Sequence, residues 1–296
     1  MLSGQQEFAM ISVELPYRPP YQWESVLRFL ASRALPNIEN VENGVYSRCV
    51  FLNGAHGKIR VENTPKHNAL TVAAASSLAP VFPDILKRLR LMFDVDCNPD
   101  AVFEKLKFLN EFRPDLCVAG TRSVGCFDAF ETAVRTVLGQ QITVKAAQTL
   151  TARFINALGE TEQTETAFPR PEKIAALPEQ NLTDLGIMPA RARAVSAIAK
   201  GLTDHTLDLS PDASPETELP KLLALPGVGP WTANYLAIRV MRAPDAFLYS
   251  DYGVKKALSP LPPKDIKALA ECCRPFGSYA TFNLWNSLTP RSGASA

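Results

Sequence analysis

The chain has 296 residues, of which 46% are apolar and 21% are charged, and its formal net charge is +1. This length allows two or three domains, and the composition is ordinary for a globular protein with a large core. No apolar run approaches the roughly 18 residues of a membrane-spanning helix, and the N-terminus lacks the pattern of a signal peptide, so we expect a cytoplasmic protein without a membrane partner. The near-neutral charge neither requires nor excludes nucleic acid, because binding needs only a local basic face.

Residues 1–100 are predicted to form a small α+β domain. In chain order the segments are a helix at 22–33, two strands within 44–63 joined by the hairpin signal at 53–57, a third strand at 68–76, and a helix at 80–93. The helices are indicated by apolar residues at helical spacing and the strands by alternation. This order predicts a small antiparallel sheet backed by helices.

From Val102 to Leu288 the sequence shows no convincing strand alternation, only helical patterns of about ten to fifteen residues separated by Pro- and Gly-marked loops. We therefore predict a mostly α protein whose second part contains about eight helices. Residues 126–243 are assigned to one helical domain, and residues 101–125 and 244–296 to a second helical lobe.

The cysteines and histidines are dispersed along the chain and suggest no metal site. Six cysteines without a framework spacing indicate reduced, mostly buried thiols. Only Cys272 and Cys273 are close together, and adjacent cysteines rarely form a structural ligand pair.

The stretch Leu225–Arg239, LPGVGPWTANYLAIR, predicts a tight turn between two helices. Gly227 and Gly229 permit positive φ and close approach of another backbone, and Pro230 suits the first helical position. Backbone amides and the positive end of the second helix then face outward together, which favours a phosphate. The alternative is an ordinary corner between two packed helices.

The sequence LPGVG followed by Thr232-Ala233 resembles the helix-hairpin-helix motif, and Asp251 follows Gly229 by 22 residues. This pair of features resembles the helix-hairpin-helix DNA glycosylase superfamily, in particular its alkylbase glycosylases. The resemblance extends to PPYQWESVLRFLASRAL, to FDAFETAVRTVLGQQITVKAA and to SYATFNLW, and so covers essentially the whole chain. It implies a core of two helical lobes with an antiparallel-sheet N-terminal domain.

The resemblance implies a partner, double-stranded DNA containing an alkylated base. Such an enzyme extrudes the base from the duplex. The hairpin would hold a phosphate through Gly227, Val228, Gly229 and Thr232. Asp251 would stabilise the oxocarbenium-like sugar and orient or deprotonate the attacking water. The alternative for Asp251 is a turn-former or a cap of the next helix.

The residue at position 231 indicates the subclass of reaction. Bifunctional relatives carry a lysine nucleophile there, and Trp231 cannot form a Schiff base. Lys255 and Lys256 do not occupy that position. We therefore predict a monofunctional hydrolase that leaves an abasic site. Relatives with an iron–sulfur cluster carry four spaced cysteines after the helical core, and none follows Cys273, so no such cluster is expected.

An aromatic set matches the positions that line the alkylbase pocket of the resembled enzymes. Its members are Phe29, Trp231, Tyr235, Tyr252 and Trp285. N-alkylated purines such as 3-methyladenine and 7-methylguanine are cationic, and an aromatic face attracts such a base by roughly 0.5–2 kcal/mol per ring. For each aromatic taken alone, core packing is the alternative.

The resemblance also implies further contacts with DNA. Gln141 occupies the place of a leucine that fills the gap left by the base, and it could fill that gap while bonding the orphaned partner base. The basic residues Arg239, Arg242, Lys255 and Lys256 are candidates for phosphate contacts. No organic cofactor is required, but a monovalent cation, Na⁺ or K⁺, could be held by the backbone carbonyls of Leu223, Leu225 and Val228. We expect a monomer, located with the nucleoid if the cell is bacterial.

Two other functions remain open from the sequence. One is a glycosylase for deaminated or oxidised bases. The other is a helix-hairpin-helix protein that binds DNA without catalysis, in which case Asp251 would be dispensable.

Overall fold

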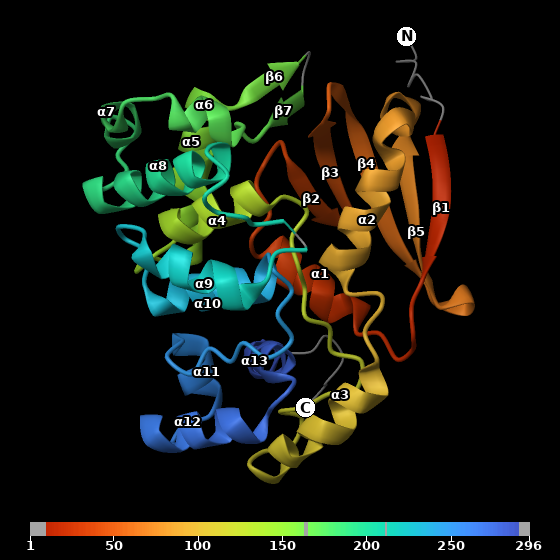
Figure 1. Ribbon diagram of the computed structural model, residues 1–296. Helices are drawn as coiled ribbons and strands as arrows, with labels where there is room; N and C mark the ends of the chain where they lie inside the picture. Colours follow the sequence, from red (N-terminus) through yellow and green to blue (C-terminus); the bar gives the residue numbers. More distant parts are fainter. Residues whose placement is uncertain (1–9, 163–164, 211, 290–296) are drawn as a thin grey trace.

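The N-terminal part of the computed structural model is a five-stranded antiparallel sheet (Figure 1), and the structure describes residues 10–162, 165–210 and 212–289. The strand order is β1 (Met10–Pro16), β5 (Ala69–Ala75), β4 (Ala55–Thr64), β3 (Val45–Leu52) and β2 (Glu39–Glu42). In register, Val61 lies opposite both Tyr46 and Val72. Helices α1 (Trp23–Ala31) and α2 (Phe82–Phe93) pack with this sheet. The predicted N-terminal α+β architecture is confirmed.

Two strands of this sheet, β1 and β2, are absent from the sequence prediction. Both lie at the edges of the sheet, where mostly exposed residues blur the alternation. The turn before β3 contains a sequence signal for a hairpin, the pair Asn43-Gly44. Both residues have positive φ, as do Asn53 and Gly54 in the next turn. Asn-Gly is the preferred pair for a two-residue hairpin.

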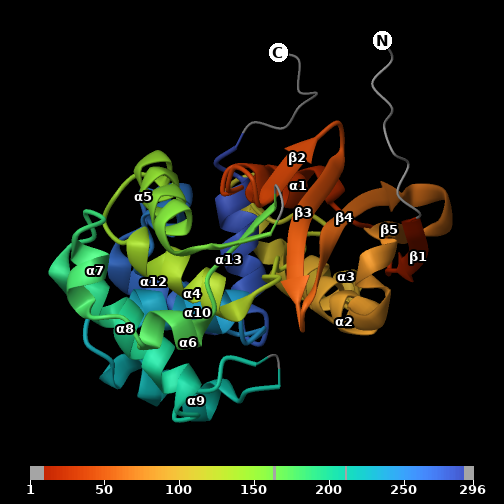
Figure 2. The same cartoon turned by 90° about the horizontal axis from the view of Figure 1, so that it is seen from above.

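The rest of the chain is largely helical and lies beside the sheet (Figure 2). The helices are α3 (Pro99–Leu106), α4 (Ala129–Leu138), α5 (Val144–Leu158), α6 (Pro171–Ala175), α7 (Glu179–Thr183), α8 (Pro189–Thr203), α9 (Pro215–Ala224), α10 (Pro230–Arg239), α11 (Tyr252–Ala257), α12 (Pro263–Cys272) and α13 (Gly277–Asn286). The prediction of no strand in this part is wrong, because β6 (Glu160–Glu162) and β7 (Glu165–Ala167) form a short hairpin. Three-residue strands are too short to show alternation.

Among the described residues, no helix has both the length and the apolar character needed to cross a membrane.

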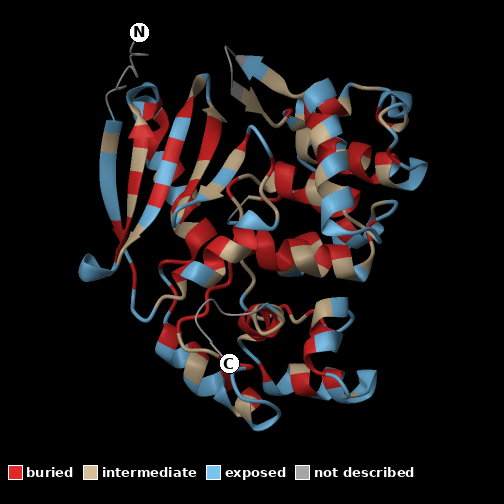
Figure 3. Cartoon of the chain, turned by 180° about the vertical axis from the view of Figure 1, so that it is seen from behind, coloured by how far each residue is buried: buried red, intermediate tan, exposed pale blue. Residues whose placement is uncertain are grey.

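Two apolar cores hold these elements together. One joins the sheet to α1, α2, α3, α11, α12 and α13, and the other lies among α4, α5, α6, α7, α8, α9 and α10. In Figure 3 the strands alternate between buried and exposed residues, as expected for a sheet with one covered face. The chain crosses between the cores near Asp128 and again near Met241.

A buried ion cluster ties the sheet to the first helix of the second core. Arg48 on β3 contacts Glu131 on α4 at 2.9 Å, and Arg135 on α4 contacts Glu39 on β2 at 2.9 Å and Glu131 at 2.6 Å. Burial alone would raise the pKa of Glu39, but Arg135 and Arg48 outweigh it and hold that pKa below its ordinary value of 4.5. The cluster therefore stabilises the fold in its ionised form.

Replacing Glu39 with Gln should lower the free energy of unfolding by about 3 kcal/mol at pH 7, because Arg48 and Arg135 would then share the single carboxylate of Glu131 and leave one buried positive charge unbalanced. Since the folded-state pKa of Glu39 is depressed, its contribution is present above pH 4.5 and is lost as the pH falls through the folded-state pKa. The difference in the free energy of unfolding between the parent and Glu39→Gln, measured by urea titration, should therefore become smaller below about pH 4.5. The exposed Glu42 of the same strand is the matched control, and an equal effect of Glu42→Gln would contradict this account.

Candidate active site and nucleic-acid interface

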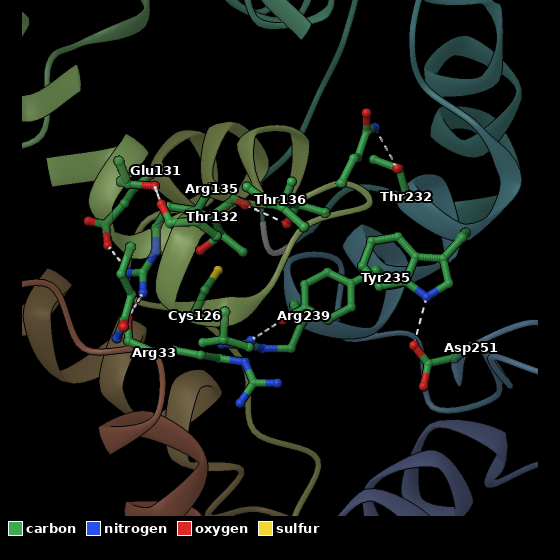
Figure 4. A pocket seen from close by; sticks show the side chains of 18 of the residues that line it. Arg33, Cys126, Glu131, Thr132, Arg135, Thr136, Thr232, Tyr235, Arg239 and Asp251 are labelled. Carbon is green, nitrogen blue, oxygen red and sulfur yellow. Dashed lines mark hydrogen bonds and ion pairs between the residues drawn. The ribbon is translucent and has the colours of Figure 1, made fainter. Parts of the chain in front are cut away.

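A cavity of about 1020 Å³ opens between the two cores, and Asp251, Gln141 and four of the five predicted aromatics line it, whereas Arg242, Lys255 and Lys256 do not. Its walls come from α1, α4, the loop after α4, the α9–α10 turn, the loop before α11, and α13. In Figure 4, Asp251 lies at one end, Arg33 and Glu131 lie toward the other, and Tyr235 and Arg239 lie between them. The structure therefore brings together residues that are more than 200 positions apart in sequence.

The helix-hairpin-helix turn joins α9 to α10, and its two glycines have different roles. Gly227 has φ +79°, and a Cβ there would lie 2.8 Å from the carbonyl oxygen of Ala190 on α8. Gly229 has φ −97°, and a Cβ there would meet nothing within 4 Å. The expectation of positive φ is thus confirmed for Gly227 and wrong for Gly229. Packing within the protein explains only the first glycine.

The amides of this turn are also not equivalent. The N–H of Val228 donates to the carbonyl of Leu225 at 3.2 Å and closes the turn. No hydrogen bond in the described part of the chain uses the N–H of Gly227 or Gly229. These two amides are therefore the ones that a phosphate could accept from.

Gln140 braces the turn, and sequence reasoning missed it. Its side-chain amide donates to the carbonyl of Gly227 and to the hydroxyl of Thr232, both at 3.0 Å. Thr232 is buried, so its side chain serves this brace and is not exposed for a contact with DNA. Gln140 sits almost 90 residues before the turn in sequence, and no local pattern could connect the two.

Asp251 is both the cap of α11 and the centre of a polar cluster. Its Oδ1 accepts from the N–H of Val254 at 3.0 Å and from the indole N–H of Trp285 at 2.9 Å. Its Oδ2 accepts from the indole N–H of Trp231 at 2.9 Å. The capping role, given above as the alternative to catalysis, is present, and it fixes the carboxylate at the edge of the cavity.

Four of the five predicted aromatics form a continuous wall. Trp231 stacks on Tyr235 at 5.2 Å, Tyr235 lies 6.1 Å from Trp285, and Trp285 stacks on Phe29 at 6.1 Å between ring centroids. Tyr252 stands apart, 79% exposed at the mouth of the cavity. Trp231, Tyr235 and Trp285 line the cavity, whereas the buried Phe29 packs behind them and fits the core-packing alternative.

The placement of two arginines corrects one expectation: Arg239 lines the cavity, and Arg242 lies outside it. Arg239 is buried and donates to the carbonyl of Gly125 at 2.8 Å and to the hydroxyl of Tyr235 at 2.8 Å. Arg242 donates to Asp94 at 2.7 Å and to the carbonyl of Ser123. The expectation that these two contact phosphates is therefore wrong, because internal acceptors hold both guanidiniums.

Arg33, which sequence reasoning missed, stacks on Phe29 with 3.9 Å between its guanidinium carbon and the ring centroid. Burial acts to raise the pKa of Tyr235, but the Arg239 and Arg33 guanidiniums outweigh it and lower that pKa. Burial in turn lowers the pKa of Arg33. The inner end of the cavity is thus electropositive, whereas its mouth is aromatic and holds one carboxylate.

Gln141 lies at the rim of the cavity with φ +55°, a left-handed conformation that is uncommon for a residue with a side chain. The exposed apolar residues Ile142 and Val144 follow it along the rim. Neither lysine nor histidine lines the cavity, and no group of three or more His, Cys, Asp or Glu side chains in the described residues is placed to hold a metal ion.

Family models match nearly the whole chain. The AlkA N-terminal domain matches residues 12–128, and the HhH-GPD superfamily base excision DNA repair protein matches residues 134–279. DNA-3-methyladenine glycosylase 2 of Escherichia coli (strain K12) is 35% identical over 274 residues, which cover 92% of this chain and 95% of that protein.

Solved structures share the fold. The 3-methyladenine DNA-glycosylase from Archaeoglobus fulgidus matches with a TM-score of 0.72 at 21% identity, over 92% of this chain and 97% of that one. The 8-oxoguanine glycosylase/lyase of Clostridium acetobutylicum, in complex with double-stranded DNA, matches with a TM-score of 0.69 at 16% identity, over 95% of this chain and 98% of that one. At these identities the likeness establishes the architecture alone.

Fold and site together define a DNA glycosylase built on a helix-hairpin-helix. The chain belongs to the HhH-GPD superfamily of base excision DNA repair proteins, in the family of DNA-3-methyladenine glycosylase 2. The predicted fold class and family are confirmed.

The two glycines of the turn give a paired prediction. Gly229→Ala should leave the free energy of unfolding within about 1 kcal/mol of the parent, because its Cβ meets open space. Its affinity for duplex DNA should nevertheless fall roughly tenfold if a phosphate approaches this amide. Gly227→Ala should instead destabilise the fold by about 2 kcal/mol, through positive φ and the clash with Ala190.

Urea titration and fluorescence anisotropy with a labelled duplex measure the two effects separately. An unchanged affinity of Gly229→Ala would remove this amide from the DNA interface.

Proposed function

We propose that this protein hydrolyses the N-glycosidic bond of alkylated bases in duplex DNA and leaves an abasic site. The observation that carries the proposal is Asp251, fixed by three N–H donors at the mouth of an aromatic-walled cavity and within one helix of the hairpin. A single chain supplies the phosphate-binding turn, the pocket and the carboxylate, which supports action as a monomer. Such an enzyme works where the DNA is, in the cytoplasm with the nucleoid if the cell is bacterial.

The hydrogen bonds on Asp251 leave one face of the carboxylate for chemistry. An ionised carboxylate has about four acceptor positions, and the three donors named above occupy three of them. Oδ1 accepts from two groups, whereas Oδ2 accepts only from Trp231. The remaining position on Oδ2 is therefore the one that can meet a water molecule or the developing positive charge at C1′.

The residues around the cavity support water rather than an amine as the nucleophile. A Schiff-base mechanism needs a lysine beside the sugar, and no lysine lines the cavity in the part of the chain that the structure describes. Trp231 fills the position that would have to supply it. Lys255 lies only four residues after Asp251, but it lines a different groove.

The aromatic wall supports a cationic base as substrate. Phe29 is buried, and Arg33 and Arg239 both lie over its ring, at 3.9 and 4.6 Å from its centroid. The faces left for a base therefore belong mainly to Trp231, Tyr235, Trp285 and the exposed Tyr252. An alkylated purine already carries positive charge and is a good leaving group, so it needs stacking rather than a strong acid.

A monovalent cation at the hairpin fits part of the predicted donor set. Leu225 is the residue at which the chain leaves α9, and its carbonyl already accepts from Val228, which leaves it a second lone pair. Leu223 and Val228 would supply the other carbonyls. Such oxygen ligands suit Na⁺ or K⁺, and the ion would add positive charge to a surface that faces a phosphate.

Replacing Asp251 with Asn should slow base release from methylated DNA by roughly 10²–10⁴-fold, because it removes the negative charge beside C1′. Asn retains the capping interaction with Val254, so the fold should persist. Single-turnover assays that quantify released 3-methyladenine and 7-methylguanine measure the effect, with inosine-containing DNA as a second substrate. Release at the parent rate by the variant would make Asp251 dispensable.

Borohydride treatment during turnover should trap no covalent protein–DNA adduct, because no lysine of the described residues lines the cavity beside Asp251. An adduct would overturn the assignment of water as nucleophile.

In the base-release assay, efficient release from inosine-containing DNA but not from methylated DNA would assign the protein to deaminated bases instead of alkylated ones.

Replacing Gln141 with Ala should weaken binding to a duplex that contains an abasic-site analogue by several-fold, because the proposal puts this residue of the cavity rim into the gap that the extruded base leaves in the stack. Gln180→Ala, on the surface of α7, is the matched control. If the two variants bind equally in fluorescence anisotropy, Gln141 does not enter the duplex.

A further inference from the structure

A second groove lies on the other side of the loop that carries Asp251. It encloses about 390 Å³ and is lined by Tyr249, Ser250, Lys255, Pro263, Lys264 and Lys267. We call it the lysine groove. Helices α11 and α12, which supply its lysines, lie side by side below α10 (Figure 1). Ser250 lines both the lysine groove and the active-site cavity, so the two sites are continuous along the surface.

The charge of this groove is not neutralised within the protein. Lys255, Lys264 and Lys267 are exposed, and no carboxylate in the described part of the chain forms an ion pair with any of them. Glu271 lies on the same face of α12 about two turns further on, but it pairs with Arg274 at 3.6 Å. Lys256 is exposed beside Lys255 and adds to the same field.

Helix stability does not explain the lysines of α12. A cation is favourable near the C-terminal end of a helix, and the last-turn position of Lys255 on α11 fits that rule. Lys264 instead stands in the first turn of α12, at the positive end of the dipole. A like charge at that end destabilises the helix slightly, and the neighbouring Asp265 in the same turn offsets it, so the helix dipole gives no reason for a lysine at position 264.

The groove also has an aromatic floor. Tyr249 is 40% exposed, and the ammonium of Lys267 lies 5.0 Å from its ring centroid. Tyr252, two residues beyond Ser250, is exposed at the cavity mouth. A basic groove with exposed aromatic rings is typical of surfaces that follow a nucleic-acid strand.

We propose that the lysine groove binds the phosphodiester backbone of the DNA substrate, as a second phosphate site beyond the hairpin. The proposal rests on the proposed function, since it takes DNA as the substrate of the adjoining cavity. The hairpin would hold the strand on one side of the extruded nucleotide, and Lys255, Lys264 and Lys267 would hold it on the side of α12. This pair of grips on either side of Asp251 would resist sliding of the sugar past the carboxylate.

The test is the salt dependence of binding to a duplex with a tetrahydrofuran abasic-site analogue. Each phosphate contact contributes about 0.9 to the slope of log K against log salt. The triple variant Lys255→Gln, Lys264→Gln, Lys267→Gln should reduce the slope by about 2–3 and weaken binding roughly tenfold or more at 100 mM salt. Replacing the same three lysines with Arg should preserve the slope.

The control is Lys58→Gln together with Lys66→Gln, two exposed lysines on the N-terminal domain. If neither the triple variant nor this control changes the slope or the affinity, the proposal is overturned, and an acidic protein partner becomes the alternative ligand of the lysine groove. If both variants weaken binding equally, the proposal is also overturned, because the effect would then follow net charge. The analogue has no scissile bond, so this result is independent of whether the wild-type protein releases alkylated bases from methylated DNA.

Discussion

The site depends on the carboxylate of Asp251 and the three N–H groups that hold it. The donors come from three helices: Trp231 from α10, Val254 from α11 and Trp285 from α13. A carboxylate bonded to three separate elements cannot move without all of them, so its distance to the hairpin on α10 is fixed. If a phosphate binds at Gly229, the fixed distance from Gly229 to Asp251 determines which sugar of the strand lies beside the carboxylate.

The inner end of the cavity depends on ion pairs between residues far apart in the chain. The sequence alone does not show which charged side chains form these pairs. Arg135 contacts Glu39 and Glu131 and donates to the carbonyl of Arg33, so the ion cluster between sheet and helices also holds the end of α1. Arg33 lines the cavity at that end, stacked on the buried ring of Phe29. The N-terminal domain therefore contributes to the pocket through α1 and through Glu39 on β2 and Arg48 on β3, which also line it.

Local patterns predicted the features whose cause is local. Helical spacing located α1 and α2, the LPGVG turn located the hairpin, and the SDYG loop located the cap at Asp251. The features that were missed depend on long-range contacts, such as Gln140 bracing Gly227, Arg33 over Phe29 and Arg239 bonded to Gly125. Arg239 is a candidate for a phosphate contact from sequence alone because a lone arginine on a helix gives no sign of its partner. The different roles of Gly227 and Gly229 also could not be predicted from the motif, because the role of Gly227 depends on the carbonyl of Ala190, which lies beside it only in the folded chain.

Trp231 shows why a neutral donor matters at this position. A lysine there would place a positive charge about 3 Å from Asp251 and form an ion pair with it, which would offset much of the field that a developing oxocarbenium ion needs. An indole N–H orients the carboxylate equally well but carries no net charge. The negative charge of Asp251 then remains available to the sugar, while the ring of the same residue extends the aromatic wall through Tyr235. One residue therefore supports both features that the proposed reaction requires, an oriented anion and a face for a cationic base.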